Sequence, residues 1–484
     1  MVDTRLGGKL RRLRHERKLT QAQMAQQLEI SASYLNLLEH NQRPITVPVL
    51  LKLVQRFSVD IDLFNADDEP QLLSDLMEAF SDPLFDVHAI KSADLKELVN
   101  VSPALGRALL TLYQASRGAR TPSRAPDSEP YGDDNNAGGE IIALPAGMPS
   151  EEVSDFIHQH GNYFHNLELA AETLWTEHGL SLDNLYPGLV TLLAMRFAVD
   201  VAVLPAETMG STLREYRPLQ RQLRLSEMLP PQSRNFQLAH QIALLGWHDE
   251  INRLTGRGKF TTQEAGMLAR SALANYFSAA VMMPYARFRE AARATRHDLD
   301  ILQHRFGASF EQVCHRLTTL RRAGAEGVPF HLIRVDIAGN ISKRFSGSGI
   351  RIARFGAACP RWNVYDAFAT PGMLRVQVSQ MPDGAAYFCV ARTITPIGRQ
   401  SRNRPFGSRV TQLAIGLGCP LSHAREVAYA DGLALEDPLI VTPIGVSCRI
   451  CERTDCADRA VPSLQYKLAV DENRRGLSVY SSTT

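Results

Sequence analysis

The chain has no apolar run of membrane-spanning length, and its basic, amphipathic start has neither the apolar core nor the cleavage site of an export signal. We therefore expect a cytoplasmic protein that does not bind a membrane. The formal net charge of the 484 residues is only +2, so a surface that binds nucleic acid has to be local. Seven cysteines in such a chain are expected to be thiols or metal ligands rather than disulfides.

One zinc-binding pattern is incomplete. In the motif H-E-x-x-H, two histidines one helical turn apart bind Zn²⁺, and the glutamate between them acts as general base. The stretch "RNFQLAHQIALL" keeps the first histidine as His240 but has Gln241 and Leu244 at the other two positions. Glutamine cannot accept the proton and leucine cannot bind the metal. We therefore expect no enzyme here, and we expect His240 to lie in the core or to line a pocket.

The composition and the pattern of apolar residues change along the chain. Residues 1–65 form a dense helical block, and residues 66–118 read as a helical connector because apolar residues recur with a period near 3.6. Residues 119–140 are rich in Pro, Gly, Asp and Asn, which predicts a disordered linker. Helical patterns resume in 141–325. In 326–484, two hairpin patterns between 331 and 400 predict a small antiparallel sheet, and a loop-rich stretch follows from 405.

The N-terminal block predicts a helix-turn-helix. Thr20 is a good N-cap for a helix over 21–28 and Ser31 for a helix over 32–39, with "EIS" as the turn between them. One small core is expected from Leu13, Leu19, Met24, Ala25, Leu28, Ile30, Tyr34, Leu35, Leu38 and Leu50. The stretch "LTQAQMAQQLEISASYLNLLEHNQRP" resembles the lambda-repressor-like (XRE) helix-turn-helix family. The alternative is a helical protein-interaction module with a solvated basic face.

The resemblance implies which residues would meet double-stranded operator DNA. Ala32, Ser33 and Leu37 would face base edges. The residues that would bind phosphates or fix the register are Gln21, Ser31, Asn36, Asn41 and Arg43. Lys9, Arg11, Arg12, Arg14, Arg17 and Lys18 would add a sequence-independent electrostatic term. One such domain reads one half-site, so a homodimer on a palindrome is expected.

The stretch around His240, together with "EAGMLARSALANYFSAAVMMP", resembles the ImmA/IrrE metallopeptidase-like family over about residues 150–295. In active members an acidic ligand precedes the second helix, but here Ser271 and Leu273 stand where it is expected. The emptied cleft can serve as a small-molecule pocket. Because the domain is fused to its own DNA-binding head, ligand sensing is favoured over cleavage of a partner.

Basic residues dominate the stretch 331–410. It contains twelve Lys and Arg residues and three acidic residues, which gives a net charge of +9. Such a patch suits a polyanion, either DNA or a phosphate-rich metabolite, because the planar guanidinium matches phosphate oxygens. The expected effector-binding residues are Arg334, Lys343, Arg344 and Arg354, with His240. The alternative is a solvated basic face.

Four of the seven cysteines lie late in the chain. Cys448, Cys451 and Cys456 form C-x2-C-x4-C in one loop, a spacing that suits a metal ion or an iron-sulfur cluster. Three ligands do not complete a zinc or 4Fe-4S site. The first choice for the fourth is Cys419 and the second is Cys359, with His423 as a substitute. The alternative is a set of structural thiols.

The motifs "FHLIRVDIAGNISKRFSGSG", "CPRWNVYDAF", "GCPLSHAREVAYADGL" and "CRICERTDCADRA" together resemble the short-chain fatty acyl-CoA regulator family. The resemblance implies a transcription factor of propionate or acetate metabolism, an acyl-CoA effector and, in some members, an iron-sulfur cluster. Alternatives are a redox or iron-sulfur sensor without acyl-CoA control, and a metallopeptidase. Because the linker is expected to be flexible, coupling between effector and DNA is expected to act through dimer geometry.

The fold class that follows is multidomain and mainly α. We expect an all-α lambda-repressor-like head, a helical degenerate metallopeptidase-like domain, and an α+β C-terminal domain with a small antiparallel sheet.

Overall fold

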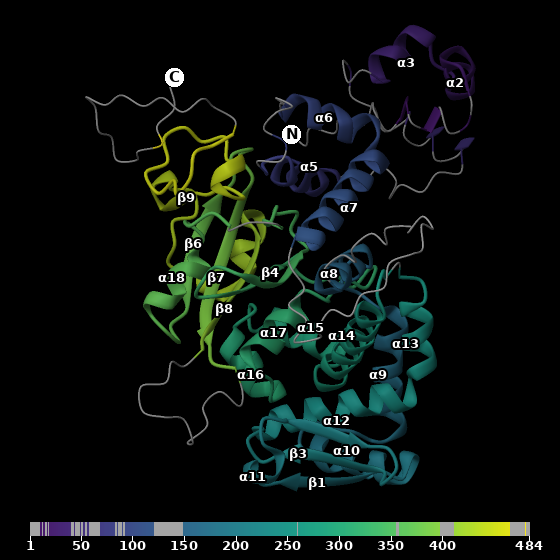
Figure 1. Ribbon diagram of the computed structural model, residues 1–484, viewed down its shortest axis with the longest axis vertical. Helices are drawn as coiled ribbons and strands as arrows, with labels where there is room; N and C mark the ends of the chain where they lie inside the picture. The colour runs from purple at the N-terminus through teal and green to yellow at the C-terminus, as the bar shows by residue number, and fades with distance from the viewer. Residues whose placement is uncertain are drawn as a thin grey trace, which may run out of the picture.

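A computed structural model describes residues 10–11, 13–14, 17, 19–39, 43, 49, 52–53, 56–57, 68–82, 85, 90, 92–120, 149–258, 260–354, 358–396, 411–464 and 480. The linker predicted for 119–140 lies outside these residues, apart from 119 and 120. In Figure 1 the helix-turn-helix, in purple, lies at one end of the molecule, and the connector helices lie between it and the C-terminal sheet. No helix in the described part of the chain is long and apolar enough to cross a membrane.

The helix-turn-helix forms where the sequence predicts it. Helix α2 spans Gln21–Leu28 and α3 spans Ala32–Glu39. Thr20 closes a capping box with Gln23, and the Ser31 hydroxyl accepts a hydrogen bond from the Tyr34 amide. The predicted core is confirmed for its described members, and Leu10, Val49, Leu53 and Phe57 complete it. Leu50 lies outside the described residues.

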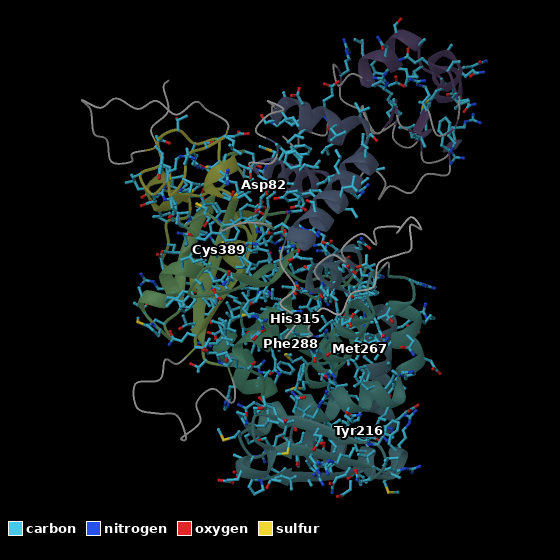
Figure 2. All side chains as sticks on the ribbon, viewed as in Figure 1. Asp82, Tyr216, Met267, Phe288, His315 and Cys389 are labelled. Atoms are coloured by element: carbon cyan, nitrogen blue, oxygen red, sulfur yellow. The ribbon has the colours of Figure 1, made fainter. Side chains whose placement is uncertain are left out.

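The connector is helical, as predicted. It consists of α5 (Asp68–Ala79), α6 (Ser92–Val101) and α7 (Pro103–Arg120). Helix α7 packs on α5 through one face, where a side chain at Gly106 would come within 3.0 Å of Leu76. The Tyr113 hydroxyl donates a hydrogen bond to the Asp82 carboxylate. Figure 2 labels Asp82 in the part of the molecule that holds the connector helices. The connector is therefore a folded three-helix unit.

The middle unit is a helical layer that also contains a sheet. Its helices are α8 (Pro149–Gln159), α9 (His165–Glu177), α10 (Leu185–Phe197), α11 (Ala206–Met209), α12 (Pro231–Gly246), α13 (His248–Thr255), α14 (Gln263–Met282), α15 (Tyr285–Ala294), α16 (Leu299–Phe306) and α17 (Phe310–Leu317). Strands β1 (Asp200–Leu204), β2 (Arg214–Arg217) and β3 (Gln222–Ser226) form a sheet of order β1-β3-β2. This sheet was not predicted, because strands of four or five residues are too short to show alternation clearly in the sequence.

The C-terminal sheet has six strands: β4 (His331–Asp336), β5 (Ile341–Ser346), β6 (Arg375–Gln380), β7 (Ala386–Ile394), β8 (Leu413–Pro420) and β9 (Val441–Pro443). Their order is β5-β4-β8-β7-β6-β9. Both predicted hairpins, β4–β5 and β6–β7, are present and antiparallel. The sheet is larger than predicted, because β8 lies at its centre and β9 pairs with β6 in parallel.

The prediction that the chain beyond 405 is loop-rich was wrong for β8, and its glycines explain why. A Cβ at Gly418 would lie 2.5 Å from the His331 ring and 2.8 Å from the Cys389 sulfur. A Cβ at Gly416 would lie 2.9 Å from Ile333. The strand needs glycine because neighbouring side chains cross it closely, although glycine in a sequence usually indicates a loop.

The C-terminal sheet lies between two other parts of the chain. Phe388 and Val390 of β7 share a core with the helices of the middle unit. Their neighbours Cys389 and Ala391 share the second core, with Leu72 and Leu76 of the connector among others. Alternation along a strand sends successive side chains to opposite faces. One face of the sheet therefore packs on the middle unit and the other on the connector (Figure 1).

Candidate functional site

The outward face of α3 presents the residues that the sequence analysis assigned to DNA. Ala32, Ser33 and Asn36 are exposed and Leu37 is half-buried, whereas Leu35 is buried in the core. Ser31 is exposed at the start of the helix. Arg43 is also exposed, and its backbone amide donates to the Leu37 carbonyl. Asn41 lies outside the described residues.

Behind this face, a buried ion pair joins Arg14 to Glu39, the last residue of α3. The Arg14 guanidinium donates to both carboxylate oxygens of Glu39, at 2.7 and 3.2 Å. The Gln21 amide donates to the same carboxylate at 2.7 Å and to Asn36 at 3.3 Å. Gln21 therefore helps to fix the position of α3 through two of that helix's side chains, Asn36 and Glu39.

Two of the basic residues expected to provide a general attraction to DNA form hydrogen bonds within the head. Arg14 is 8% exposed, and Arg17 donates to the Phe57 carbonyl at 2.8 Å. Arg11 is exposed, and Lys9, Arg12 and Lys18 lie outside the described residues. The expectation was wrong for Arg14, because the buried Glu39 carboxylate needs a cationic partner.

His240, the residue retained from the zinc-binding pattern, is buried and hydrogen-bonded to a side chain of α14. His240 is 4% exposed, and its Nδ1 lies 2.8 Å from the Asn275 side-chain oxygen. Burial first, and then the nearby Arg214, lower the pKa of His240 to about 4, so the ring is neutral at pH 7. The Arg214 Nη1 atom is buried without a hydrogen-bond partner among the described residues.

Asn275 is a residue that the sequence analysis did not assign. It projects from α14, whereas Ser271 lies one turn earlier and Leu273 is fully buried. Gln241 is buried and Leu244 half-buried. The sequence "ALANYF" contains this asparagine, but nothing local in it indicates that Asn275 faces His240.

The basic patch predicted for 331–410 is largely neutralised by acids from elsewhere in the chain. Of its twelve cations, four lie outside the described residues, and seven of the other eight form ion pairs. The predicted net charge of +9 counted only acids within the same window. Because partners such as Asp75, Glu151 and Glu311 lie outside that window, the patch is much less basic than expected.

The five expected effector residues do not form one site. Arg334 and Lys343 share Glu311 of α17, at 2.7 and 3.5 Å. Arg344 and Arg354 share Glu151 of α8. His240 is hydrogen-bonded within the middle unit. The structure thus brings together two pairs of cations, each with its own carboxylate.

Arg354 is the centre of a cluster that joins three parts of the chain. Its guanidinium contacts Asp75 of α5 at 3.2 Å, Glu151 of α8 at 3.3 Å, and Asp155 of α8. Its backbone amide donates to Glu78 at 2.7 Å. Removal from water raises the pKa of the Asp75 carboxyl, and the Arg354 charge opposes that effect. The cluster attaches the connector to the C-terminal and middle units.

A cavity of about 190 Å³ lies beside this cluster, and a smaller one of about 50 Å³ adjoins it. Gln71 of the connector, His158 of α8 and Phe345 of β5 line both cavities. Arg344 and Arg354 line the smaller one. The cavities are therefore lined by all three units that Arg354 joins.

Arg321 reaches the larger cavity between two glycines. A Cβ at Gly347 would lie 3.0 Å from its Nη1 atom and 2.5 Å from the Phe330 carbonyl oxygen, and a Cβ at Gly161 would lie 3.7 Å from its Nε atom. The guanidinium forms no hydrogen bond or ion pair with another described residue. It is a free cation at the cavity wall.

The structure separates the two candidates for a fourth cysteine ligand. Cys359 interacts electrostatically with Cys448 and Cys451, and burial first, then these thiols, raise its pKa. Cys419 interacts with Cys389 and Glu426 instead. The first choice, Cys419, is not supported, because it lies in the core shared with the middle unit, whereas Cys359 lies in the core on the other face.

The cysteine loop is surrounded by hydrogen-bond donors. Arg459 donates to the carbonyls of Cys448 and Cys451, and the Ala460 amide lies 3.5 Å from the Cys448 sulfur. Cys456 is partly exposed. Within the described residues, no three His, Cys, Asp or Glu side chains are arranged to hold one metal ion. Ligation by this set would need the loop to close further on Cys359.

Three stretches of the chain match the models of known families. Residues 5–66 match a helix-turn-helix domain, residues 194–318 an IrrE N-terminal-like domain, and residues 319–480 the C-terminal domain of short-chain fatty acyl coenzyme A regulators. The HTH-type transcriptional regulator PrpR of Mycobacterium tuberculosis is 42% identical over 99% of this chain and 96% of its own length. This chain belongs to the short-chain fatty acyl-CoA regulator family.

Other members of the family match over similar lengths. The HTH-type transcriptional regulator RamB of Mycobacterium tuberculosis is 40% identical over 99% of both chains. The propionyl-CoA carboxylase regulator of Cereibacter sphaeroides is 41% identical over 98% of both chains. A solved structure titled as a Mycobacterium tuberculosis transcriptional regulator aligns with a TM-score of 0.66 at 43% identity, covering 69% of this chain and all of that one.

Proposed function

We propose that this regulator binds double-stranded operator DNA as a homodimer and that a short-chain acyl-CoA sets its DNA affinity. The exposed face of α3, with Ser33 and Asn36 outward, supports the DNA-reading role. The name of the propionyl-CoA carboxylase regulator supports propionate metabolism as the controlled process. With the zinc ligands replaced and His240 bonded to Asn275, the former protease cleft supports a scaffold role rather than catalysis.

The observation that carries the proposal is the attachment of the connector to the sheet beside a cavity. Arg354 holds α5 through Asp75, and Gln71 of the same helix lines the cavity while donating to the Ile352 carbonyl at 3.2 Å. A ligand that contacts Gln71 and α8 together would change the free energy of this attachment. The connector precedes the linker in the chain, so coupling to the DNA-binding head does not have to pass through residues 119–140. This path is an alternative to coupling through dimer geometry.

The lining of the cavity fits one end of an acyl-CoA. Phe345 and Ile350 offer apolar surface for a short acyl chain, and Arg321 offers an unpaired guanidinium for an anionic group. A cavity of about 190 Å³ would hold the acyl-thioester end, while the nucleotide would remain outside it. Arg344 and Arg354 border this region, so the earlier assignment of these two residues stays a prediction here. Arg334, Lys343 and His240 do not line either cavity.

The test is a titration of the full chain, purified anaerobically, onto DNA from upstream of its own gene. DNA affinity is measured at fixed salt with acetyl-, propionyl- and butyryl-CoA, with free CoA as control. One acyl-CoA should change the affinity about tenfold, which corresponds to about 1.4 kcal/mol of coupling. Binding of DNA with no response to any acyl-CoA would overturn effector control.

A variant pair locates the effector. Arg321→Ala should reduce the acyl-CoA response and leave DNA affinity without effector unchanged. Arg257→Ala is the matched control, because Arg257 is exposed and does not line the cavity. An unchanged response in Arg321→Ala would place the effector elsewhere, with the two cation pairs on Glu311 and Glu151 as the next candidates.

For the cofactor we propose a 4Fe-4S cluster, with zinc as the alternative, held by Cys359, Cys448, Cys451 and Cys456. The donor set supports this, because three thiols already interact and backbone and guanidinium groups surround them. A thiolate cluster is negative, and hydrogen bonds from such groups stabilise it. When bound, the cluster would provide redox sensitivity. If no acyl-CoA changes DNA affinity but oxidation does, this loop becomes the sensor.

A further inference from the structure

The wall of the larger cavity has a net positive charge. Among the described residues that line it, only Arg321 carries a fixed charge, and none is an acid. The nearby acids Asp75 and Asp155 line only the smaller cavity, where both pair with Arg354. A ligand in the larger cavity therefore meets one cation without a competing carboxylate in the wall.

Two side chains of this wall are available as hydrogen-bond donors. The Gln71 amide already donates at 2.7 Å to an acid on its own helix, and the Ser346 hydroxyl donates at 2.8 Å to the Ile350 carbonyl. Gln159, like Arg321, forms no hydrogen bond or ion pair with another described residue. The Arg321 guanidinium and the Gln159 amide can therefore both donate to a ligand.

The cavity also has an apolar part, and its size limits what can enter. Phe345 and Ile350 are 5% and 2% exposed, and the centroid of the Phe345 ring lies 5.7 Å from that of the His158 ring. An apolar cavity of about 150 Å³ can hold a molecule the size of benzene. At about 190 Å³, this cavity suits a short acyl group and is too small for a nucleotide.

The unpaired guanidinium distinguishes between acyl groups of the same shape. Arg321 is exposed, so its guanidinium has access to water. A neutral acyl chain that filled the cavity would remove part of this water and offer no hydrogen bond in return. A carboxylate would replace the water with charge-assisted hydrogen bonds, which are stronger than those between neutral groups. The wall therefore favours an acyl group that ends in a carboxylate.

We infer that the larger cavity selects a short-chain acyl thioester whose acyl group carries a free carboxylate, such as a malonyl or succinyl group, and that Arg321 pairs with this carboxylate. The inference rests on the proposed function, which places the acyl end in this cavity and the nucleotide outside it. Because the phosphates stay outside, the anion that meets Arg321 has to belong to the acyl group. A carboxylate has two acceptor oxygens, so it can also accept from Gln159.

The first test compares two ligands of matched shape, malonyl-CoA and 3-methylbutyryl-CoA. Both acyl groups end in the same branch, with oxygen atoms in the first and methyl groups in the second. The full chain, purified anaerobically, should bind malonyl-CoA about tenfold more tightly or better in a calorimetric titration without DNA. Free CoA is the control for the nucleotide. Equal affinity for the two thioesters, or tighter binding of the neutral one, would overturn the inference.

A set of variants tests the assignment to Arg321. Arg321→Gln removes the charge and keeps a polar side chain, so the preference for malonyl-CoA should fall to within about twofold. Arg321→Lys keeps the charge and should restore most of the preference. Arg257→Gln is the matched control, because Arg257 is exposed and lines neither cavity. A full preference in Arg321→Gln would show that another group recognises the carboxylate, and would overturn the assignment.

Measurements of DNA affinity separate this inference from the function on which it rests. They are made at saturating concentrations of both thioesters and of acetyl-, propionyl- and butyryl-CoA. If these ligands change DNA affinity but malonyl-CoA binds no more tightly than its neutral counterpart, effector control holds and only selection by charge fails. If no thioester binds or changes DNA affinity, the effector proposal fails and the inference fails with it.

Discussion

Arg354 lies 3.2 Å from the Asp75 carboxylate, and the two residues come from parts of the chain 279 positions apart. Asp75 belongs to the connector that follows the DNA-binding head, and Arg354 follows the first hairpin of the C-terminal sheet. Both side chains are nearly buried, at 6% and 10% exposure. In a buried site, loss of one partner leaves an uncompensated charge on the other. The pair therefore controls how firmly the connector is attached.

Asp75→Asn should loosen the connector. Arg354 keeps Glu151 and Asp155, so the cost should be about 1–3 kcal/mol rather than that of an isolated buried charge. Hydrogen exchange of α5, α6 and α7 should accelerate, and the DNA affinity should respond less to the effector. Glu97→Gln, an exposed acid on α6, is the control. If exchange in the connector is the same in both variants, the pair does not control the attachment.

Arg14→Ala should unfold the DNA-binding head. It removes the cation that donates two hydrogen bonds to the buried Glu39, a loss of about 3–5 kcal/mol. Binding to every DNA sequence should be lost together. Arg11→Ala removes an exposed cation and should lower only the salt dependence of binding, by about one unit of slope. Thermal unfolding and binding at several salt concentrations distinguish the two, and equal behaviour would contradict the structural role of Arg14.

In the described part of the head, the helices α2 and α3 could be predicted from the sequence, whereas the C-terminal half could be predicted only in part. Thr20 and Ser31 act locally, so the bounds of both helices follow from neighbouring residues. The sheet depends on contacts between distant segments. Nothing local in "LAIGLGC" reveals that Gly418 has to clear the His331 ring, so β8 could not be recognised.

The net charge of a surface also could not be predicted from the local sequence. A count of residues within a window cannot include a partner such as Asp75, which is 279 positions away from Arg354. The choice between Cys419 and Cys359 likewise depended on which face of the sheet each residue takes. His240 was correctly expected to be buried, since its motif had lost the other ligands, but its partner Asn275 required the packing of α12 on α14.

Ser33→Ala should relax base specificity without changing the fold. Ser33 is exposed and is the only polar residue among the three expected to face bases, so discrimination at one base pair should fall by about 1–3 kcal/mol. Ser31→Ala removes an N-cap and should cost about 1 kcal/mol of stability while weakening all sequences alike. Binding to an operator library separates them. Unchanged base preferences in Ser33→Ala would move the reading to other residues.

Cys359→Ser should lose most of the iron that the wild-type chain takes up on anaerobic reconstitution, whereas Cys419→Ser should keep it. Cys359 lies beside Cys448 and Cys451, and Cys419 lies in the other core. Iron and sulfide content per chain, with the visible absorption of the cluster, are the measurements. The reverse result would restore Cys419 as the ligand, and zinc in place of iron would identify the alternative cofactor.

Acid should destabilise the middle unit through His240. Burial lowers the pKa of this ring from 6.5 to about 4, so the folded state stays neutral at pH values where the unfolded chain takes up a proton. The stabilisation is present above pH 6.5 and is lost as pH falls toward 4. At 1.36 kcal/mol per pH unit, the total is about 3 kcal/mol. His240→Gln should therefore flatten the decline of stability between these values, whereas His178→Gln, an exposed histidine after α9, should not. Urea unfolding at a series of pH values, followed by fluorescence, measures the difference. Parallel curves for all three proteins would show that His240 takes up its proton equally in both states.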